Sequence, residues 1–373
     1  MRVAIFTENS FNSFDGILSY FEGIIPHFGK LDNNKLTIIN CDLDYCENNS
    51  KITVKRKWGI KLPYFDFYLN FPNISEVDKL LNNVDIIQIS GPGTMGLVGR
   101  YLAWKRKIPI VVHHHTNIDA YARVVSNIII EKIIKIYIKI FYCGIKDIIA
   151  PTEHCAKNLE KFLRNKRFHI IKRAINHKVF CRRTNFDNFK KIKNVFESKK
   201  NGKKILLYAG RISPEKNILS MQKIYSKKIQ FVFVGSGSYL NRIKKTFKTS
   251  VFIPRQTQED LSYWYSSADF FVFPSKTDTF GNVVLESLAC GTPVIAHKNT
   301  SAGEIIEDGK TGFLVDDFEQ VWGKLNINKK EYNKMVKKGI QESKKYSWEK
   351  IYLQHIFLYQ QILSNFSKNI SRT

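Results

Sequence analysis

The sequence is short of acidic residues and has no cysteine pattern that builds a zinc site or a disulfide framework. Asp and Glu number 33 against 59 Lys and Arg, so the 373-residue chain has a formal net charge of +26. None of the six cysteines forms a Cys-x-x-Cys pair, and we interpret them as reduced cytosolic thiols. The basic excess favours polyphosphate ligands, an anionic membrane surface or nucleic acid, with a merely solvated basic surface as the plainest alternative.

Long apolar runs are also missing. No uninterrupted apolar stretch reaches the 18 residues of a membrane-spanning helix. Residues 1–8 predict a short buried strand rather than a signal peptide, because the apolar run is too short and Glu8 follows it. Residues 128–142 come nearest to a long apolar run, but Lys132, Lys135 and Lys139 interrupt them. They predict an amphipathic helix that packs mainly on the core, with membrane contact as the alternative.

Short apolar runs alternate with helical segments through the whole chain, which is typical of parallel strands covered on both faces. Apolar residues make up 43% of the chain, enough for packed cores. The expected strands lie at 3–6, 35–40, 84–89, 108–113, 147–150 and 168–171, and again at 204–209, 229–234, 250–253, 269–273, 294–296 and 312–315.

The break in this pattern predicts two doubly wound α/β domains. We place the first at residues 1–185, a basic connection at 186–204, the second domain at 205–345, and a C-terminal helical segment at 346–373 that packs back towards the first domain. Ligands bind at the carboxyl ends of the strands in such sheets, so both domains are expected to face a common cleft.

Two glycine motifs and a histidine triplet could indicate a dinucleotide site and a metal site, and we reject both interpretations. Residues 91–96 match the G-x-G-x-x-G dinucleotide fingerprint, but they follow an interior strand, and Pro92 removes an N–H that a diphosphate would need. Gly235-Ser236-Gly237 lacks the third glycine. In His113-His114-His115 only the first and third side chains can share one side of a strand, and no third metal ligand is evident. We therefore predict no nicotinamide cofactor and no metal.

The stretch 270–286 carries the strongest chemical signal. It reads as a strand, a polar loop containing Asp278, and a helix that contains Glu286. A helix N-terminus favours an anion, and two flanking carboxylates can accept hydrogen bonds from hydroxyls, which together describe a sugar nucleotide. A second strand end, at 209–217, offers Arg211 and Lys216 to the same anion, with a solvated helix start as the alternative.

These motifs resemble those of the retaining glycosyltransferases of family 4, which have the GT-B architecture. The resemblance rests on Gly-Arg-Ile-Ser-Pro-Glu-Lys-Asn at 210–217, Val-Gly-Ser-Gly at 234–237, and the run from Pro274 to Ala296, in that order and spacing. Within the family, the sequence looks most like the Asp-Thr-Phe-Gly subgroup of lipid and saccharide glycosyltransferases. A GT-B fold, with two Rossmann-like domains across a cleft, is thereby implied.

The resemblance also implies roles for individual residues. Asp278 would hold hydroxyls of the donor sugar and Glu286 the ribose, while Arg211 and Lys216 would stabilise the departing diphosphate. These two basic residues would replace a metal. The remaining implied positions are the donor contacts Gly16, Phe280, Gly281, Asn282 and Val283, the catalytic His115 beside the reacting sugar, and the acceptor-binding candidates Tyr121 and Arg173.

The function expected on these grounds is hexosyl transfer with retention of configuration, from a UDP- or GDP-sugar to a membrane lipid or lipid-linked saccharide. No cofactor beyond the nucleotide sugar and no nucleic-acid partner are expected. We expect a cytoplasmic protein, peripheral at the inner face of the membrane, where an anionic surface would attract its positive charge. A GT-B sugar-nucleotide epimerase or a sucrose-type synthase is the enzymatic alternative, and a basic nucleic-acid-binding protein the remote one.

Overall fold

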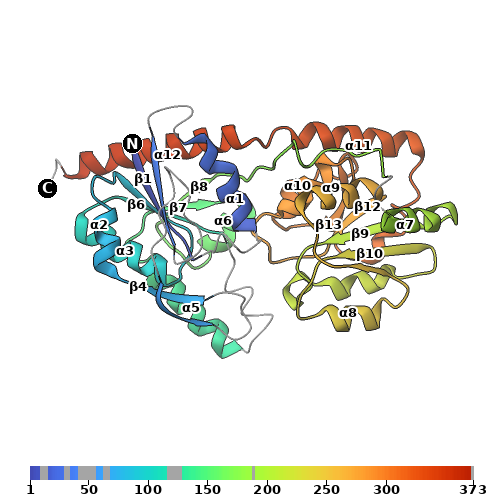
Figure 1. Cartoon of the computed structure of the whole chain (residues 1–373), viewed down its shortest axis with the longest axis horizontal. Helices are drawn as coiled ribbons and strands as arrows, with labels where there is room; N and C mark the ends of the chain where they lie inside the picture. Colours follow the sequence, from blue (N-terminus) through green and yellow to red (C-terminus); the bar gives the residue numbers. More distant parts are fainter. Residues whose placement is uncertain are drawn as a thin grey trace. The chain divides into compact units, whose positions relative to one another are not determined.

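The computed structural model describes residues 1–8, 16–28, 34–40, 56–61, 68–115, 128–186 and 190–370. It divides into two compact units (Figure 1). Unit 1 comprises Met1–Ala174 and Trp348–Thr373, and unit 2 comprises Ile175–Ser347. Each unit is built on its own six-stranded sheet.

The sheet of unit 1 is parallel throughout and has the strand order β2-β1-β5-β6-β7-β8. In that order the strands are Lys35–Ile39, Arg2–Phe6, Ile86–Ile89, Ile110–His113, Asp147–Ala150 and Arg167–Ile170. The helices in the described residues of the unit are α1 (Gly16–Ile24), η1 (Ile25–His27), α2 (Ile74–Leu80), α3 (Thr94–Arg106), α5 (Ile128–Tyr142), α6 (Glu153–Glu160) and α12 (Trp348–Ile370). The last of these, α12, packs on α1 and η1, so the end of the chain completes the first unit.

The sheet of unit 2 is also parallel, in the order β11-β10-β9-β12-β13-β14. Its strands are Val251–Ile253, Ile229–Val234, Lys204–Ala209, Phe270–Phe273, Val294–His297 and Gly312–Val315. Helices α7 (Lys190–Lys200), α8 (Leu240–Thr246), α9 (Gln258–Ser267), α10 (Asn282–Ala289) and α11 (Lys329–Ser343) surround it, with the 3-10 segments η2 (Pro214–Lys216), η3 (Ile218–Ile224), η4 (Ala302–Glu304) and η5 (Phe318–Val321).

Strand β9 shows why these apolar runs form parallel strands. Leu206 and Tyr208 belong to one buried cluster, while Leu207 and Ala209 belong to another. Successive side chains point to opposite faces, so a strand covered on both faces must be apolar at every position. The predicted pair of doubly wound parallel sheets is confirmed.

The structure differs from the expectations in four local features. Helix α7 occupies part of the expected 186–204 connection; its Ile192 and Val195 are buried in the core of unit 2. The first unit ends at Ala174, earlier than the expected 185. An antiparallel pair, β3 (Arg56–Lys61) and β4 (Tyr68–Pro72), adds a small sheet that we had not expected. The chain after Ser213 forms 3-10 segments instead of an α-helix.

The expectation that α5 packs mainly on the core was also wrong. Ile138, Phe141 and Tyr142 are buried, but most of its isoleucines are exposed to solvent. The amphipathic pattern correctly predicts a helix, but most of the apolar side chains of this helix do not pack on the core. Of the helices in the described residues, none is both long and apolar enough to cross a membrane.

Candidate active site

The junction between β12 and α10 has the predicted strand, loop and helix order. Gly281 is the N-cap of α10 and has φ 96° and ψ 65°, in the left-handed region that side chains rarely adopt. Phe280, just before it, is buried and anchors the loop in the core. The loop therefore turns sharply into the helix at a position that requires glycine.

The N-terminus of α10 differs from those of its neighbours in unit 2. Thr257 caps α9 and Asn328 caps α11, each accepting a hydrogen bond from a backbone N–H in the first turn. Gly281 has no side chain to do this, and α10 has no acidic residue in its first turn. The positive end of this helix is therefore suited to an external anion.

The loop after β9 is tied to the loop after β12, because the two strands are neighbours in the sheet. Lys216 lies against Asp278, with 2.5 Å between Nζ and Oδ1, and both side chains are about one-sixth exposed. Two further hydrogen bonds join the loops, from Thr277 Oγ1 to the Glu215 carbonyl at 3.2 Å and from Asn217 Nδ2 to the Pro274 carbonyl at 3.2 Å. Residues 62 positions apart in sequence thus form one site.

Arg211 belongs to the same β9 loop, five residues before Lys216. Its side chain is exposed, and its carbonyl accepts a hydrogen bond from the Tyr208 hydroxyl at 2.6 Å. The loop packs against the turn after β10, where a Cβ on Gly235 would lie 2.0 Å from the Gly210 carbonyl oxygen. This close approach of two backbones explains the second glycine motif without a dinucleotide.

Glu286 lies one turn inside α10 and contacts a residue that the sequence did not reveal. The hydroxyl of Tyr265, on α9, donates to Glu286 Oε2 at 2.9 Å. Burial raises the pKa of Glu286 to about 7, although the Tyr265 hydrogen bond opposes the rise. Tyr265 could not be found from sequence, because only the packing of α9 on α10 brings it close.

In unit 1, His115 and Arg173 are both buried and in contact. Arg173 donates to His115 Nδ1 at 2.8 Å. Arginine has no acceptor, so the neutral imidazole carries its proton on Nε2. Burial and then the Arg173 charge hold the pKa of His115 well below its usual range, which keeps the ring neutral. Of the other predicted residues of this unit, Gly16 is the first residue of α1, and Tyr121 lies outside the described residues.

A buried aromatic cluster surrounds His115. His113 and His115 do share one side of the strand, with ring centroids 3.9 Å apart. Tyr20 of α1 packs on both rings and hydrogen bonds to His355 of α12 at 2.9 Å. His355 Nδ1 lies 2.8 Å from the Ile351 carbonyl, so its Nε2 accepts from the tyrosine. The C-terminal helix thereby fixes the packing beside His115.

The G-x-G-x-x-G motif has a structural explanation. The carboxylate of Glu8 lies at the N-terminus of α3, where it accepts hydrogen bonds from the Met95 N–H and from Thr94 Oγ1 at 3.1 Å. A Cβ on Gly93 would lie 2.4 Å from Glu8 Cγ. The glycine thus makes room for a carboxylate of the protein itself, which occupies the place of a phosphate. Burial raises the pKa of Glu8 to about 7.

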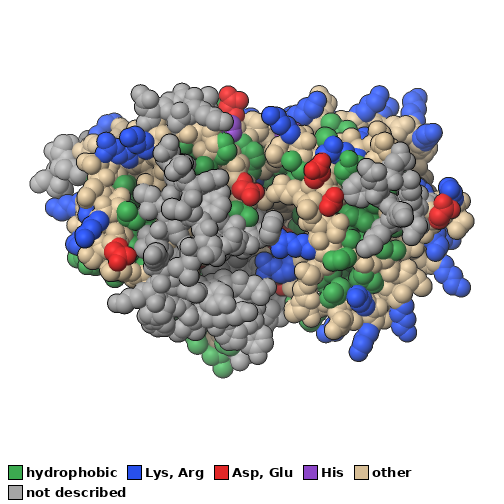
Figure 2. Space-filling model, viewed as in Figure 1, with side chains coloured by type: hydrophobic (Ala, Val, Ile, Leu, Met, Phe, Trp, Pro, Cys, Tyr) green, Lys and Arg blue, Asp and Glu red, His purple; other side chains and the backbone are tan. Residues whose placement is uncertain are grey.

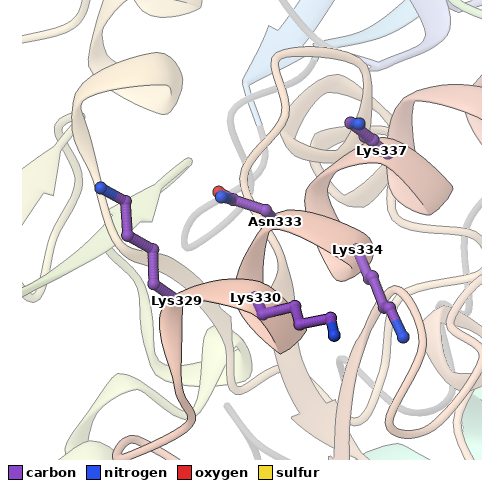
Figure 3. A pocket seen from close by; sticks show the side chains of 5 residues that line it. All are labelled: Lys329, Lys330, Asn333, Lys334 and Lys337. Atoms are coloured by element: carbon purple, nitrogen blue, oxygen red, sulfur yellow. The ribbon is translucent and has the colours of Figure 1, made fainter.

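Elsewhere, the described residues hold neither a metal-binding cluster nor, on α11, a converging set of lysines. Among the described residues, no group of three or more His, Cys, Asp or Glu is placed to hold a metal. Four lysines gather on α11 around a shallow pocket (Figure 3). The side chains of Lys329 and Lys337 point away from those of Lys330 and Lys334, so the amines do not converge on one ligand. This face is a solvated basic surface.

Both halves of the chain match known protein families. Residues 40–179 match the model described as Glycosyltransferase Family 4, and residues 189–341 match the model described as Glycosyl transferases group 1. Together the two matches span most of the sequence.

Individual proteins are similar over comparable lengths. The alpha-monoglucosyldiacylglycerol synthase of Streptococcus pneumoniae is 26% identical over 84% of this chain and 75% of its own length. The GDP-mannose-dependent alpha-mannosyltransferase of Corynebacterium glutamicum is 23% identical over 86% of this chain and 78% of its own. The solved structure of a sucrose-phosphate synthase from Thermosynechococcus elongatus superimposes with a TM-score of 0.74, at 17% identity, and covers 98% of this chain and 99% of that one. This last likeness concerns the fold.

Proposed function

We propose that this chain, which carries the two domains of family 4 and group 1 glycosyltransferases in a GT-B fold, transfers a hexosyl group from a nucleoside-diphosphate sugar to a lipid acceptor with retention of configuration. The observation that carries the proposal is the contact between the loops after β9 and β12, just before the N-terminus of α10. Lys216, the carboxylate of Asp278 and the positive end of α10 belong to these adjoining segments.

The charges of this site suit the departure of a nucleoside diphosphate. Bond cleavage leaves negative charge on the diphosphate, and preorganised positive groups stabilise that charge as it develops. Lys216 and the N-terminus of α10 would supply the positive charge, with Arg211 as the exposed second cation. No metal ion is needed in this scheme. An incoming diphosphate would compete with Asp278 for Lys216, releasing the Asp278 carboxylate for hydroxyls of the sugar.

Glu286 suits the ribose. A carboxylate accepts hydrogen bonds from two neighbouring hydroxyls when it is ionised, and burial places its titration near neutral pH. The hydroxyl of Tyr265 orients the carboxylate. The first residues of α10 and its cap, Gly281 to Val283, would present backbone N–H groups to the donor.

The neutral His115 is proposed to act at the transferred sugar. Its Nε2–H can donate to a hydroxyl or to a phosphate oxygen, and Arg173 keeps it in that tautomer. Arg173 is therefore a positioning residue in this scheme, not an acceptor contact. The acceptor is proposed to be a membrane lipid, and diacylglycerol is the first to try, since a relative is named for monoglucosyldiacylglycerol synthesis.

Donor turnover by two variants tests the site. Glu286→Ala and Lys216→Ala should each lower kcat/KM for the donor by 10²-fold or more, at roughly 3 kcal/mol of lost stabilisation. Lys223→Ala is the matched control, because Lys223 also lies 2.5 Å from a carboxylate, that of Asp317, but at an exposed surface of the same unit. Activity near the unmodified level in either site variant, or an equal loss in the control, would contradict the assignment.

Two successive experiments identify the donor first and the acceptor second. Thermal shifts with UDP- and GDP-sugars select the nucleotide, and product analysis with diacylglycerol then tests the acceptor. Incubation of the donor alone, followed by a search for an epimer, separates transfer from epimerisation. The anomeric configuration of the product, read by NMR coupling constants, decides whether the reaction retains it.

A further inference from the structure

Helix α5 of unit 1 has a large apolar face in contact with solvent. Five of its isoleucines are more than half exposed, with exposed fractions between 58% and 68%: Ile128, Ile129, Ile133, Ile136 and Ile140. Soluble proteins seldom expose so many large aliphatic side chains on one element, and such patches mark interaction sites.

Most of the exposed isoleucines form one face of the helix, with a basic border on one side. At 100° per residue, Ile133, Ile136 and Ile140 fall within an arc of about 60°. Lys132 and Lys139 lie on the border between this arc and the buried side of the helix, and both are exposed. The acidic residue of the helix, Glu131, is buried and paired with Lys135 at 2.6 Å. The exposed charge of α5 is therefore positive.

Helix α3 adds a second apolar stripe next to α5. Leu97, Tyr101 and Trp104 recur at helical spacing and are exposed, Trp104 to 78%. Arg100, on the same helix, donates to the carbonyls of Ile140 and Phe141 at 2.7 and 2.8 Å, which joins α3 to the end of α5. Hydrophobic side chains show at the edge of the molecule over α5 (Figure 2). Aromatic residues beside an aliphatic face are typical of contact with the headgroup region of a bilayer.

We propose that this docking surface, formed by the exposed isoleucines of α5 and by Leu97, Tyr101 and Trp104 of α3, lies in the interface of an anionic lipid bilayer. The isoleucines would enter the acyl boundary, while Lys132 and Lys139 extend to the phosphates. Trp104 would lie at headgroup depth. The proposal rests on the proposed function only in that a lipid acceptor gives the docking a purpose.

Features of the surface favour a bilayer over a protein partner. The exposed isoleucines and the residues of α3 belong to two separate helices, and a fluid bilayer adapts to such a surface. A second copy of the chain docked through the same face would bring the lysine borders of two molecules together. Anionic lipid instead complements those borders, in a chain of formal net charge +26.

Vesicle co-sedimentation of the full chain, without donor, tests the proposal. We expect binding to vesicles of phosphatidylcholine with phosphatidylglycerol, and binding that salt weakens. The triple variant Ile133→Gln, Ile136→Gln and Ile140→Gln should lower the partition coefficient on the order of a hundred-fold, because three aliphatic side chains no longer enter the bilayer. Glutamine keeps the helix propensity at exposed positions, so folding is preserved.

A charge variant and a matched apolar control separate the two contributions. Lys132→Gln with Lys139→Gln should lower binding to the anionic vesicles roughly ten-fold and leave binding to pure phosphatidylcholine unchanged. Leu353→Gln with Phe357→Gln, on exposed positions of α12 in the same unit, should leave both unchanged.

Unchanged vesicle binding in the isoleucine variant, or an equal loss in the α12 control, would overturn the proposal. So would a change in the sedimentation coefficient of the isoleucine variant in the absence of lipid, since that identifies a protein interface. Donor-induced thermal shifts of all variants are measured in parallel. Normal shifts with failed docking refute the docking surface alone, whereas absent shifts in the unmodified chain refute the proposed function alone.

Discussion

Replacing Glu286 with glutamine tests the electrostatics of the proposed donor site through stability as well as activity. Burial raises the pKa of this carboxyl from its usual value of 4.5 to about 7 in the folded chain. Between these pH values the folded state binds a proton that the unfolded state has lost. At about 1.4 kcal/mol per pH unit, the carboxyl therefore contributes about 3 kcal/mol of stability at pH 4.5 and below, which is lost as the pH rises through 7.

Glu286→Gln removes this dependence, because glutamine has nearly the same shape and does not titrate. The free energy of unfolding of the variant, minus that of the unmodified chain, should rise by about 3 kcal/mol between pH 4.5 and pH 8. Urea unfolding at a series of pH values measures this difference. Glu8 of unit 1 also has a pKa of about 7, but it is present in both proteins and cancels in the difference.

A difference that stays constant with pH would refute the reasoning, since Glu286 would then titrate alike in folded and unfolded chains. Tyr265→Phe is the companion variant. Loss of its hydrogen bond removes an interaction that lowers the pKa of Glu286, so the loss of stability should move to higher pH. Donor affinity should fall below pH 7 in the unmodified chain, because the protonated carboxyl accepts fewer hydrogen bonds from ribose hydroxyls.

Three other substitutions have expected outcomes. Gly281→Ala should lower the free energy of unfolding by about 1–3 kcal/mol and weaken donor binding in titration calorimetry, because alanine is strained at φ 96°. Glu8→Ala should cost about 1–2 kcal/mol in urea unfolding, since the Met95 N–H loses its acceptor at the N-terminus of α3. Tyr20→Phe should cost about 1–2 kcal/mol and increase amide exchange in α12, because His355 loses its buried partner. Unchanged stability in any one of these variants would contradict the contact invoked for it.

The strands could be predicted because a parallel strand covered on both faces must be apolar at every position. All twelve expected strands are present; four have the expected bounds, and the other eight differ by one or two residues at one or both ends. The β3–β4 pair was missed because it is antiparallel and lies outside the two main sheets. Helix α7 was mistaken for a connection because its lysines outnumber the few side chains, such as Ile192 and Val195, that anchor it in the core.

The candidate site was predicted in part. One motif gave Asp278 and Glu286 and a second gave Lys216, and in the structure Lys216 lies 2.5 Å from Asp278. Their roles in donor binding remain predictions. Tyr265 carried no signal, since a tyrosine on a neighbouring helix has no fixed spacing from Glu286 in sequence. Glu8 was noted only as the end of a strand, and its position against α3 depends on the pairing of β1 with β5.

By itself, the sequence determined which segments form strands and helices and where the glycine turns and charged residues fall, because these depend on local periodicity and backbone freedom. The tertiary structure alone decided which partner each segment received. The amphipathic pattern of 128–142 fits either a core or a bilayer, and only the packing of unit 1 leaves its isoleucines exposed. In the same way, only the sheet order of unit 2 makes β9 and β12 neighbours and so brings Lys216 to Asp278. Contacts between distant segments are set by the summed packing of many side chains, which no local pattern encodes.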